Sequence, residues 1–164
     1  MTSTSEYNIR EYESLHQPSF ERLYRTWFTG HFRAAPEPLD EFVLQQPEKA
    51  ILEHGGAILV ALQEDRLAGM VALKKMDSHS FELTKMAVAE EFRGKGLGKE
   101  LVRAAIGKAA SLGARRIILY SHKSLEAALH IYEKLGFTEV SLEPGTYSHF
   151  RCDVKMELGL DEQA

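Results

Sequence analysis

The sequence is poor in cysteine and has no strong excess of charge of either sign. Its 164 residues include a single cysteine, Cys152, so no disulfide can form within the chain. A lone cysteine is typical of proteins in a reducing compartment, and most such thiols are buried core groups rather than nucleophiles. We therefore interpret Cys152 as a strand residue and expect a cytoplasmic protein.

Long hydrophobic runs, basic tracts and clustered metal ligands are also missing. No apolar stretch approaches the length needed to cross a bilayer, and the polar first six residues lack the apolar centre of a signal peptide. A net charge of −4 without a basic tract argues against a nucleic-acid partner. The histidines are scattered, and neither C-x-x-C nor H-E-x-x-H occurs. We expect no nucleic-acid, membrane or metal binding.

Hydrophobic patterning predicts one mixed α/β domain, in which helices pack on a central sheet. The chain is long enough for a sizeable core, and its 44% hydrophobic content is ordinary for a globular protein. The predicted order is a strand at 7–12, two helical stretches at 18–32 and 39–54, three strands at 57–62, 67–73 and 79–89, a helix ending near 113, a strand at 116–120, a helix ending at 136, and strands at 137–142 and 150–158. No repeat or linker divides this series.

The strand predicted at 79–89 leads into a glycine-rich turn, so the direction of its side chains matters. Successive side chains of a strand point to opposite faces. Strict alternation would divide them into two sets, one face carrying Glu82, Thr84, Met86 and Val88 and the other carrying Phe81, Leu83, Lys85 and Ala87. This prediction decides which residues would meet a molecule bound beside the turn.

The turn itself reads Arg93-Gly94-Lys95-Gly96-Leu97-Gly98-Lys99 and precedes an amphipathic helix. Glycines let backbone N–H groups approach a bound group closely, and a helix start adds unpaired N–H groups and the positive end of its dipole. These features indicate an anion site, most naturally for phosphate. The alternating glycines fit neither a P-loop nor a dinucleotide fingerprint, and a plain link between strand and helix is the alternative.

A second pattern, Ala128-x-x-x-Tyr132-x-x-x-Gly136-Phe137, lies in the last predicted helix. Taken alone, its tyrosine could be a core aromatic residue. The two patterns together resemble those of the GNAT superfamily of acyl-CoA N-acyltransferases, of bacterial type. Residues 93–98 fit the family's Q/R-x-x-G-x-G/A signature, and residues 128–137 fit its closing A-x-x-x-Y-x-x-x-G-F. The specific resemblance runs from about residue 57 to residue 137.

The resemblance implies a fold and a cofactor. A single GNAT-like α/β domain would cover 1–164, with polar ends near 1–6 and 159–164 that could be flexible. Its central sheet would be mixed, mostly antiparallel, splayed between the fourth and fifth strands and flanked by about four helices. The implied co-substrate is acetyl-CoA, without a metal. Its binding residues would be Met86, Ala87, Val88, Arg93, Gly94, Lys95, Gly96, Leu97, Gly98 and Lys99.

The resemblance also implies direct acetyl transfer from acetyl-CoA to a primary amine within a ternary complex. A phenol is protonated at neutral pH, so Tyr132 is the predicted general acid for the departing thiolate. Glu82 is the candidate general base, with His122 as its rival and His79 a weaker one. Contacts to the acceptor are expected from one region, comprising Phe28, His31, Phe32, Tyr147 and His149.

Three functions stay open at this point. The first is acetylation of a small-molecule amine, and the second is acetylation of a protein lysine or N-terminus. The third is a module that holds acyl-CoA without turnover, against which the presence of Tyr132 argues. Dimers are common among proteins of this kind, so a homodimer is a further expectation. The acceptor amine and the acyl group beyond acetyl are not specified by the sequence.

Overall fold

The computed structural model describes residues 7–143 and 152–160. Its strands are β1 (Asn8–Glu11), β2 (Ala57–Gln63), β3 (Arg66–Lys75), β4 (Ser80–Val88), β5 (Arg116–Ser121), β6 (Thr138–Val140) and β7 (Val154–Gly159). Its α-helices are α1 (Gln17–Phe32), α2 (Pro38–Gln45), α3 (Pro47–Ala50), α4 (Leu97–Ser111) and α5 (Glu126–Lys134). The predicted order of elements is confirmed, and Pro47 divides the second helical stretch into α2 and α3.

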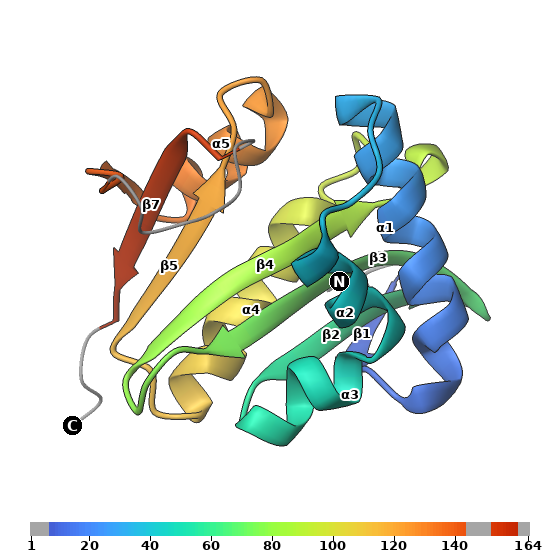
Figure 1. Ribbon diagram of the computed structural model, residues 1–164, viewed down its shortest axis with the longest axis horizontal. Helices are drawn as coiled ribbons and strands as arrows, with labels where there is room; N and C mark the ends of the chain where they lie inside the picture. Colours follow the sequence, from blue (N-terminus) through green and yellow to red (C-terminus); the bar gives the residue numbers. More distant parts are fainter. Residues whose placement is uncertain (1–6, 144–151, 161–164) are drawn as a thin grey trace, which may run out of the picture.

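The strands form one sheet in the order β1-β2-β3-β4-β5-β7-β6. Neighbouring strands are antiparallel except β4 and β5, which run parallel. These two strands pair only from Ser80 with Arg116 to Glu82 with Ile118, and beyond that point they separate (Figure 1). The splay predicted between the fourth and fifth strands is therefore confirmed. It leaves the second half of β4 without a β5 partner.

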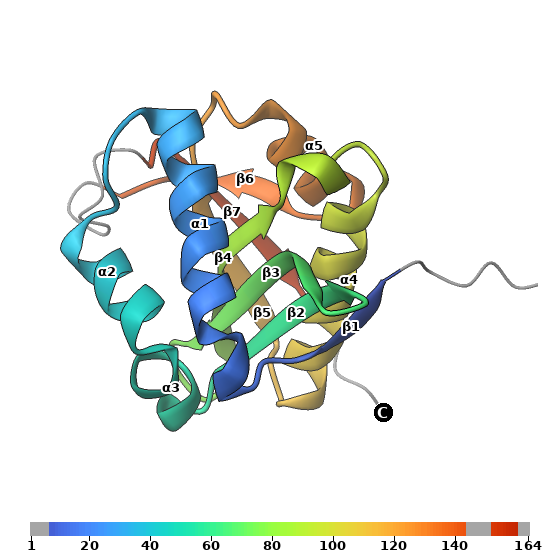
Figure 2. The same ribbon diagram turned by 90° about the vertical axis from the view of Figure 1, so that its right-hand side faces the viewer.

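Helices cover both faces of the sheet. Helices α1, α2 and α3 lie on one face and α4 lies on the other (Figures 1 and 2). The core accordingly has two parts, one beneath α4 and α5 that contains Leu101 and Leu119, and one beneath α1–α3 that contains Phe20 and Leu44. Each of these side chains is at most 1% exposed, and burying one such group is worth about 1.5–3 kcal/mol. The helices on both faces of the sheet are therefore held in place by buried side chains around the gap between β4 and β5.

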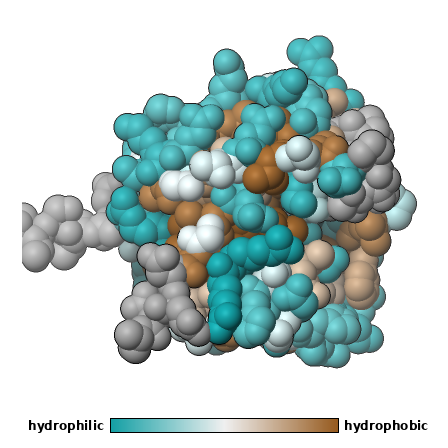
Figure 3. Space-filling view, turned by 90° about the vertical axis from the view of Figure 1, so that its left-hand side faces the viewer, coloured by the Kyte–Doolittle hydropathy of each residue, from teal (hydrophilic) through white to brown (hydrophobic). Residues whose placement is uncertain are grey.

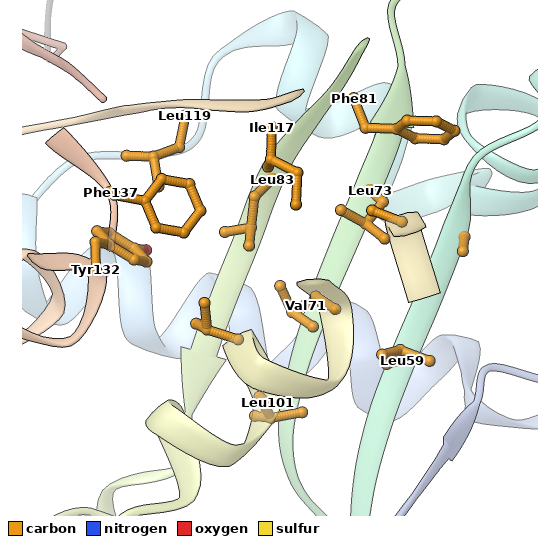
Figure 4. Packing of buried hydrophobic residues seen from close by; sticks show 14 of the residues in the cluster. Leu59, Val71, Leu73, Phe81, Leu83, Leu101, Ile117, Leu119, Tyr132 and Phe137 are labelled. Atoms are coloured by element: carbon orange, nitrogen blue, oxygen red, sulfur yellow. The ribbon is translucent and has the colours of Figure 1, made fainter. Parts of the chain in front are cut away.

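The core beneath α4 and α5 extends to the gap between β4 and β5. Figure 4 shows Leu83 of β4 and Ile117 of β5 packed close together, with Tyr132 and Phe137 beside Leu119. On the face seen in Figure 3, apolar residues gather in a central band with polar residues around it. None of the helices in the described part of the chain combines the length and the apolar character of a membrane span.

A β-bulge interrupts β4. Ala72 of β3 pairs with Thr84, and Met70 pairs with Ala87, so one residue of β3 opposes two residues of β4. Lys85 is one of those two residues, and its φ of 57° lies in the left-handed region. A residue inserted in this way bends the strand and reverses the side-chain alternation that follows it.

The bulge makes strict alternation the wrong prediction for β4 beyond Thr84. Met86 and Val88 pack against the core beneath α4, whereas Ala87 belongs to the core beneath α1–α3. Lys85 also points to the second face, where its ammonium reaches α2. The two faces of the strand end therefore carry different residues from those expected.

The end of the chain also differs from the prediction. β6 is shorter than expected, with three residues that pair only with β7 at the edge of the sheet. β7 begins at Val154, so Cys152 lies before the strand rather than in it. The backbone N–H of residue 153 donates a hydrogen bond to the carbonyl oxygen of Ser121 at the end of β5. This bond holds the chain beside β5 just before β7 begins. Cys152 is thereby left beside the gap between β4 and β5.

Candidate functional site

A cleft of about 650 Å³ opens where β4 and β5 separate. Its walls come from the end of β4, the glycine turn, the first turn of α4 and one side of α5. Nine of the ten residues predicted to bind the cofactor line it: Met86, Ala87, Val88, Arg93, Gly94, Gly96, Leu97, Gly98 and Lys99. The tenth, Lys95, is exposed on the turn outside the lining. The structure thus brings together residues that the sequence grouped by pattern.

The glycine turn has the backbone geometry of an anion cradle. Gly94 and Gly96 have φ of 77° and 84°, conformations that glycine adopts at little cost. Gly96 caps α4 without any side-chain hydrogen bond, so the first N–H groups of the helix stay available at the cleft wall. A Cβ on Gly98 would stand 3.0 Å from Ile131 Cδ1, which explains why α5 can approach so closely here. A negative group bound here would meet these N–H groups and the positive end of the helix dipole.

A smaller cavity of about 100 Å³, called the chamber below, adjoins the cleft. The two share part of their lining, namely Trp27, Met86, Leu125 and Ala128. The rest of the chamber wall is formed by Tyr24, Phe28, Phe32, Asp40, Leu83, Thr84, Lys85, Tyr120, Ser121, His122, Tyr132 and Cys152. A molecule in the cleft and a second one in the chamber would therefore meet at the end of β4.

Tyr132 lines the chamber, one helical turn along α5 from Ala128, which lines both cavities. It lies on α5, is 6% exposed and packs with its ring centroid 5.8 Å from that of Phe137. Burial raises the pKa of its phenol above the usual range, so the hydroxyl is protonated at neutral pH. Within the described part of the chain this hydroxyl makes no hydrogen bond, and the residue belongs to the chamber lining. The group can therefore offer a proton to a molecule in the chamber.

Glu82 lies behind the chamber rather than in its wall. It is 6% exposed on β4, and burial raises the pKa of its carboxyl, while the charges of Lys85 and Lys74 oppose the shift. Its charge in turn raises the pKa of Tyr120, after the larger effect of burial, and Tyr120 does line the chamber. Because Glu82 does not line the chamber, proton transfer from a molecule there would need an intermediary such as water.

The two histidine candidates differ in position. His122 lines the chamber, with Nδ1 2.7 Å from Ser124 Oγ and Nε2 3.6 Å from Asp153 Oδ2. His79 lies at the opposite end of β4, where its carbonyl accepts the backbone N–H groups of residues 115 and 116. His122 thus lies in the chamber wall, whereas His79 lies away from both cavities.

The region expected to contact the acceptor is only partly brought together. Phe28 and Phe32 line the chamber, whereas His31 lines the cleft and stacks on Trp27 with ring centroids 4.7 Å apart. Tyr147 and His149 lie outside the described residues.

The chamber residues that sequence reasoning missed include Tyr24, Asp40, Lys85 and Tyr120. The aromatic residues carry the same helical or strand spacing as core residues, so no pattern could separate them. Cys152, expected to be an inert strand residue, is also in the wall, and burial raises the pKa of its thiol to about 12. A protonated thiol of this kind is a poor nucleophile.

The known proteins that this chain resembles in sequence include acetyltransferases. The profile of the acetyltransferase (GNAT) family matches residues 10–137. The chain is 32% identical to the N-acetyltransferase YjgM of Escherichia coli K12, over 76% of this chain and 74% of that protein. It is 41% identical to mycothiol acetyltransferase of Corynebacterium efficiens over 49% of this chain, a segment that spans only 27% of that protein.

A solved structure shows the same fold. The acetyltransferase yncA of Salmonella typhimurium, determined with its cofactor acetyl-CoA, aligns with a TM-score of 0.75 and 20% identity. The alignment covers 98% of this chain and 97% of that one. At this identity the likeness concerns the fold, and it includes the whole arrangement of strands and helices around the cleft.

Proposed function

The chain belongs to the acetyltransferase (GNAT) family, and from this premise we propose that it transfers an acetyl group from acetyl-CoA to a primary amine of a small molecule. The observation that carries the proposal is that two cavities adjoin at Met86 and Ala128, with Tyr132 in the wall of the smaller one. One cavity has a backbone cradle for phosphate, and the other is a small chamber with a protonated phenol in its wall. This arrangement suits a donor and an acceptor that meet directly.

The cleft suits both the pyrophosphate and the pantetheine arm of acetyl-CoA. The pyrophosphate would bind the N–H groups of residues 94–99, where backbone and helix dipole both favour negative charge. The pantetheine arm would run along the end of β4, whose outer edge has lost its β5 partner. Ala89 donates its N–H to Ala68 on β3, so by alternation the N–H of Val88 points to the cleft side. That N–H can polarise the thioester carbonyl.

The chemistry then needs few groups. The acceptor amine loses a proton to a base, and its nitrogen forms a bond to the thioester carbon as the C–S bond breaks. The sulfur leaves as thiolate and takes the proton of Tyr132, which is recovered from solvent. Glu82 through water, or His122 directly, would accept the amine proton. No covalent enzyme intermediate is required, because donor and acceptor are held side by side.

The chamber favours a short acceptor. Its volume of about 100 Å³ compares with roughly 10–15 Å³ for one water on the same kind of measure, so it admits a slender molecule of several heavy atoms. Its walls include side chains that are themselves buried, such as Tyr24 and Phe28. These features support a small-molecule amine over a protein N-terminus, whose backbone is broader. An extended lysine side chain is the second candidate, since it is equally slender.

A direct assay separates these functions. We expect the protein to release CoA thiol from acetyl-CoA when short primary amines are added, and to do so more slowly with lysine-containing peptides. Faster turnover of the peptides would favour the protein acceptor. Tight acetyl-CoA binding without thiol release for any amine would favour the binding module, and absence of acetyl-CoA binding would contradict the proposal altogether.

The pH dependence tests the base. Because burial raises the pKa of Glu82, kcat at saturating amine should fall as the pH drops through a value above the usual range for glutamate. Glu82→Gln should lower kcat by about 100-fold and remove this acid limb. The measurement is the pH profile of kcat for the wild type, Glu82→Gln and His122→Gln. A limb that survives Glu82→Gln but disappears in His122→Gln would assign the base to His122.

A further inference from the structure

A buried ion pair faces the chamber. Lys85 Nζ lies 2.6 Å from Asp40 Oδ1, and the two side chains are 6% and 8% exposed. The pair joins the bulge of β4 to α2, and both residues belong to the chamber lining. The ammonium also lies 5.2 Å from the centre of the Tyr24 ring. A charged donor and a charged acceptor are therefore presented side by side to whatever enters the chamber.

This pair is costly for the fold. Lys85 has a φ of 57°, a conformation that a residue with a Cβ adopts only at a cost. Burying two charges costs free energy as well, and a buried ion pair is often no more stabilising than apolar residues of the same volume. Strained residues that persist in a structure tend to cluster at functional sites. The strain and the burial together point to a role in the site rather than in stability.

Resting on the proposed function, we propose that the Lys85–Asp40 pair recognises a neutral polar group, a hydroxyl or a carboxamide, at the end of the acceptor remote from its amine. Such a group has both a donor and an acceptor. It can therefore accept a hydrogen bond from the Lys85 ammonium and donate one to the Asp40 carboxylate. It satisfies both partners without adding charge to a buried site.

Charged ends fit the pair less well. A carboxylate on the acceptor would bind Lys85 only beside the carboxylate of Asp40, with Glu82 close by. A second ammonium would bind Asp40 only beside the ammonium of Lys85. Uncharged alkyl ends would pack on the aromatic side chains of α1 in the chamber wall but would leave the pair without a ligand. The chamber therefore favours hydroxylated or amide-bearing amines over these three classes.

Four amines of similar length give the first test: 3-amino-1-propanol, n-butylamine, β-alanine and 1,3-diaminopropane. We expect kcat/KM to be about 10- to 100-fold higher for the alcohol than for n-butylamine, the range for a hydrogen bond to charged groups. β-Alanine and the diamine should be at least about 10-fold poorer than the alcohol. Equal rates, or a preference for either charged amine, would overturn the inference while leaving the proposed function intact. No turnover of any amine would contradict the proposed function itself.

Variants of the pair give the second test. A single substitution leaves one buried charge without its ion-pair partner and is expected to destabilise the fold. The double variant Lys85→Met with Asp40→Leu replaces both charges by apolar groups of similar size. We expect it to turn over n-butylamine and to lose the 10- to 100-fold advantage of the alcohol. The matched control is Lys108→Met with Glu11→Leu, which removes a pair between α4 and the β1 end and should keep the wild-type preference. An unchanged preference in the Lys85/Asp40 double variant would overturn the proposal.

Discussion

Replacing Tyr132 by phenylalanine is expected to lower kcat by about 10²- to 10⁴-fold, the range that a general acid contributes. The change removes the phenol that is proposed as the acid, while it keeps the ring that packs on Phe137. The departing thiolate would then take its proton from water. The affinity for acetyl-CoA and the thermal unfolding midpoint should stay close to those of the wild type, because the hydroxyl makes no hydrogen bond within the described residues.

A second buried phenol supplies the control. Tyr12 is 7% exposed and donates a hydrogen bond to Glu48 over 2.8 Å, far from the cleft. Tyr12→Phe should lower the free energy of unfolding by about 1–2 kcal/mol and leave kcat unchanged. Stopped-flow or steady-state release of CoA thiol measures both variants. Wild-type turnover by Tyr132→Phe would remove this residue from the mechanism.

Introducing a carboxylate at the phosphate cradle is expected to have the second large effect. In Gly96→Asp, the new side chain would stand at the N-cap of α4, where nothing lies within 4 Å of the added Cβ. Aspartate suits an N-cap and tolerates a positive φ better than most residues, so the fold should be retained. A bound pyrophosphate would meet a like charge at short range. We expect the dissociation constant for acetyl-CoA to rise about 100-fold, which corresponds to roughly 3 kcal/mol.

Gly113→Asp is the matched control. Gly113 follows the other end of α4, has a φ of 91°, and likewise has open space around an added Cβ. Calorimetric titration with acetyl-CoA should give the wild-type affinity for this variant, even if its stability falls. Equal affinities for the two variants would mean that the glycine turn does not hold the phosphates.

The proposed donor side of the site could be identified from the sequence because it is local. The turn at residues 93–99 is continuous in the chain, and its glycines and the helix after it specify a backbone conformation by themselves. Ten residues, from the turn and from the end of β4, are predicted to bind the cofactor, and nine of them line the cleft. Tyr132 was identifiable because its spacing from Gly136 and Phe137 belongs to a pattern with a known fold. The splay of β4 from β5 followed from the same resemblance.

The proposed acceptor side could not be identified from the sequence because it is built from distant residues. Asp40 and Lys85 are 45 positions apart, and nothing in either neighbourhood indicates that they meet. The bulge that turns Lys85 toward α2 has no glycine to mark it, so strict alternation placed Met86 and Val88 on the wrong face. Glu82 illustrates the same limit, since only the fold reveals that it stands behind the chamber wall.

Mass spectrometry of a single turnover tests the central claim most directly. The protein is mixed with one equivalent of acetyl-CoA labelled in the acetyl group, with and without 3-amino-1-propanol. Direct transfer predicts an unchanged protein mass without the amine, and labelled N-acetylated amine together with free CoA when the amine is present. A labelled acetyl-enzyme that forms without the amine and then passes its acetyl group to it would contradict direct attack. Absence of any N-acetylated product across short primary amines would contradict the proposed activity.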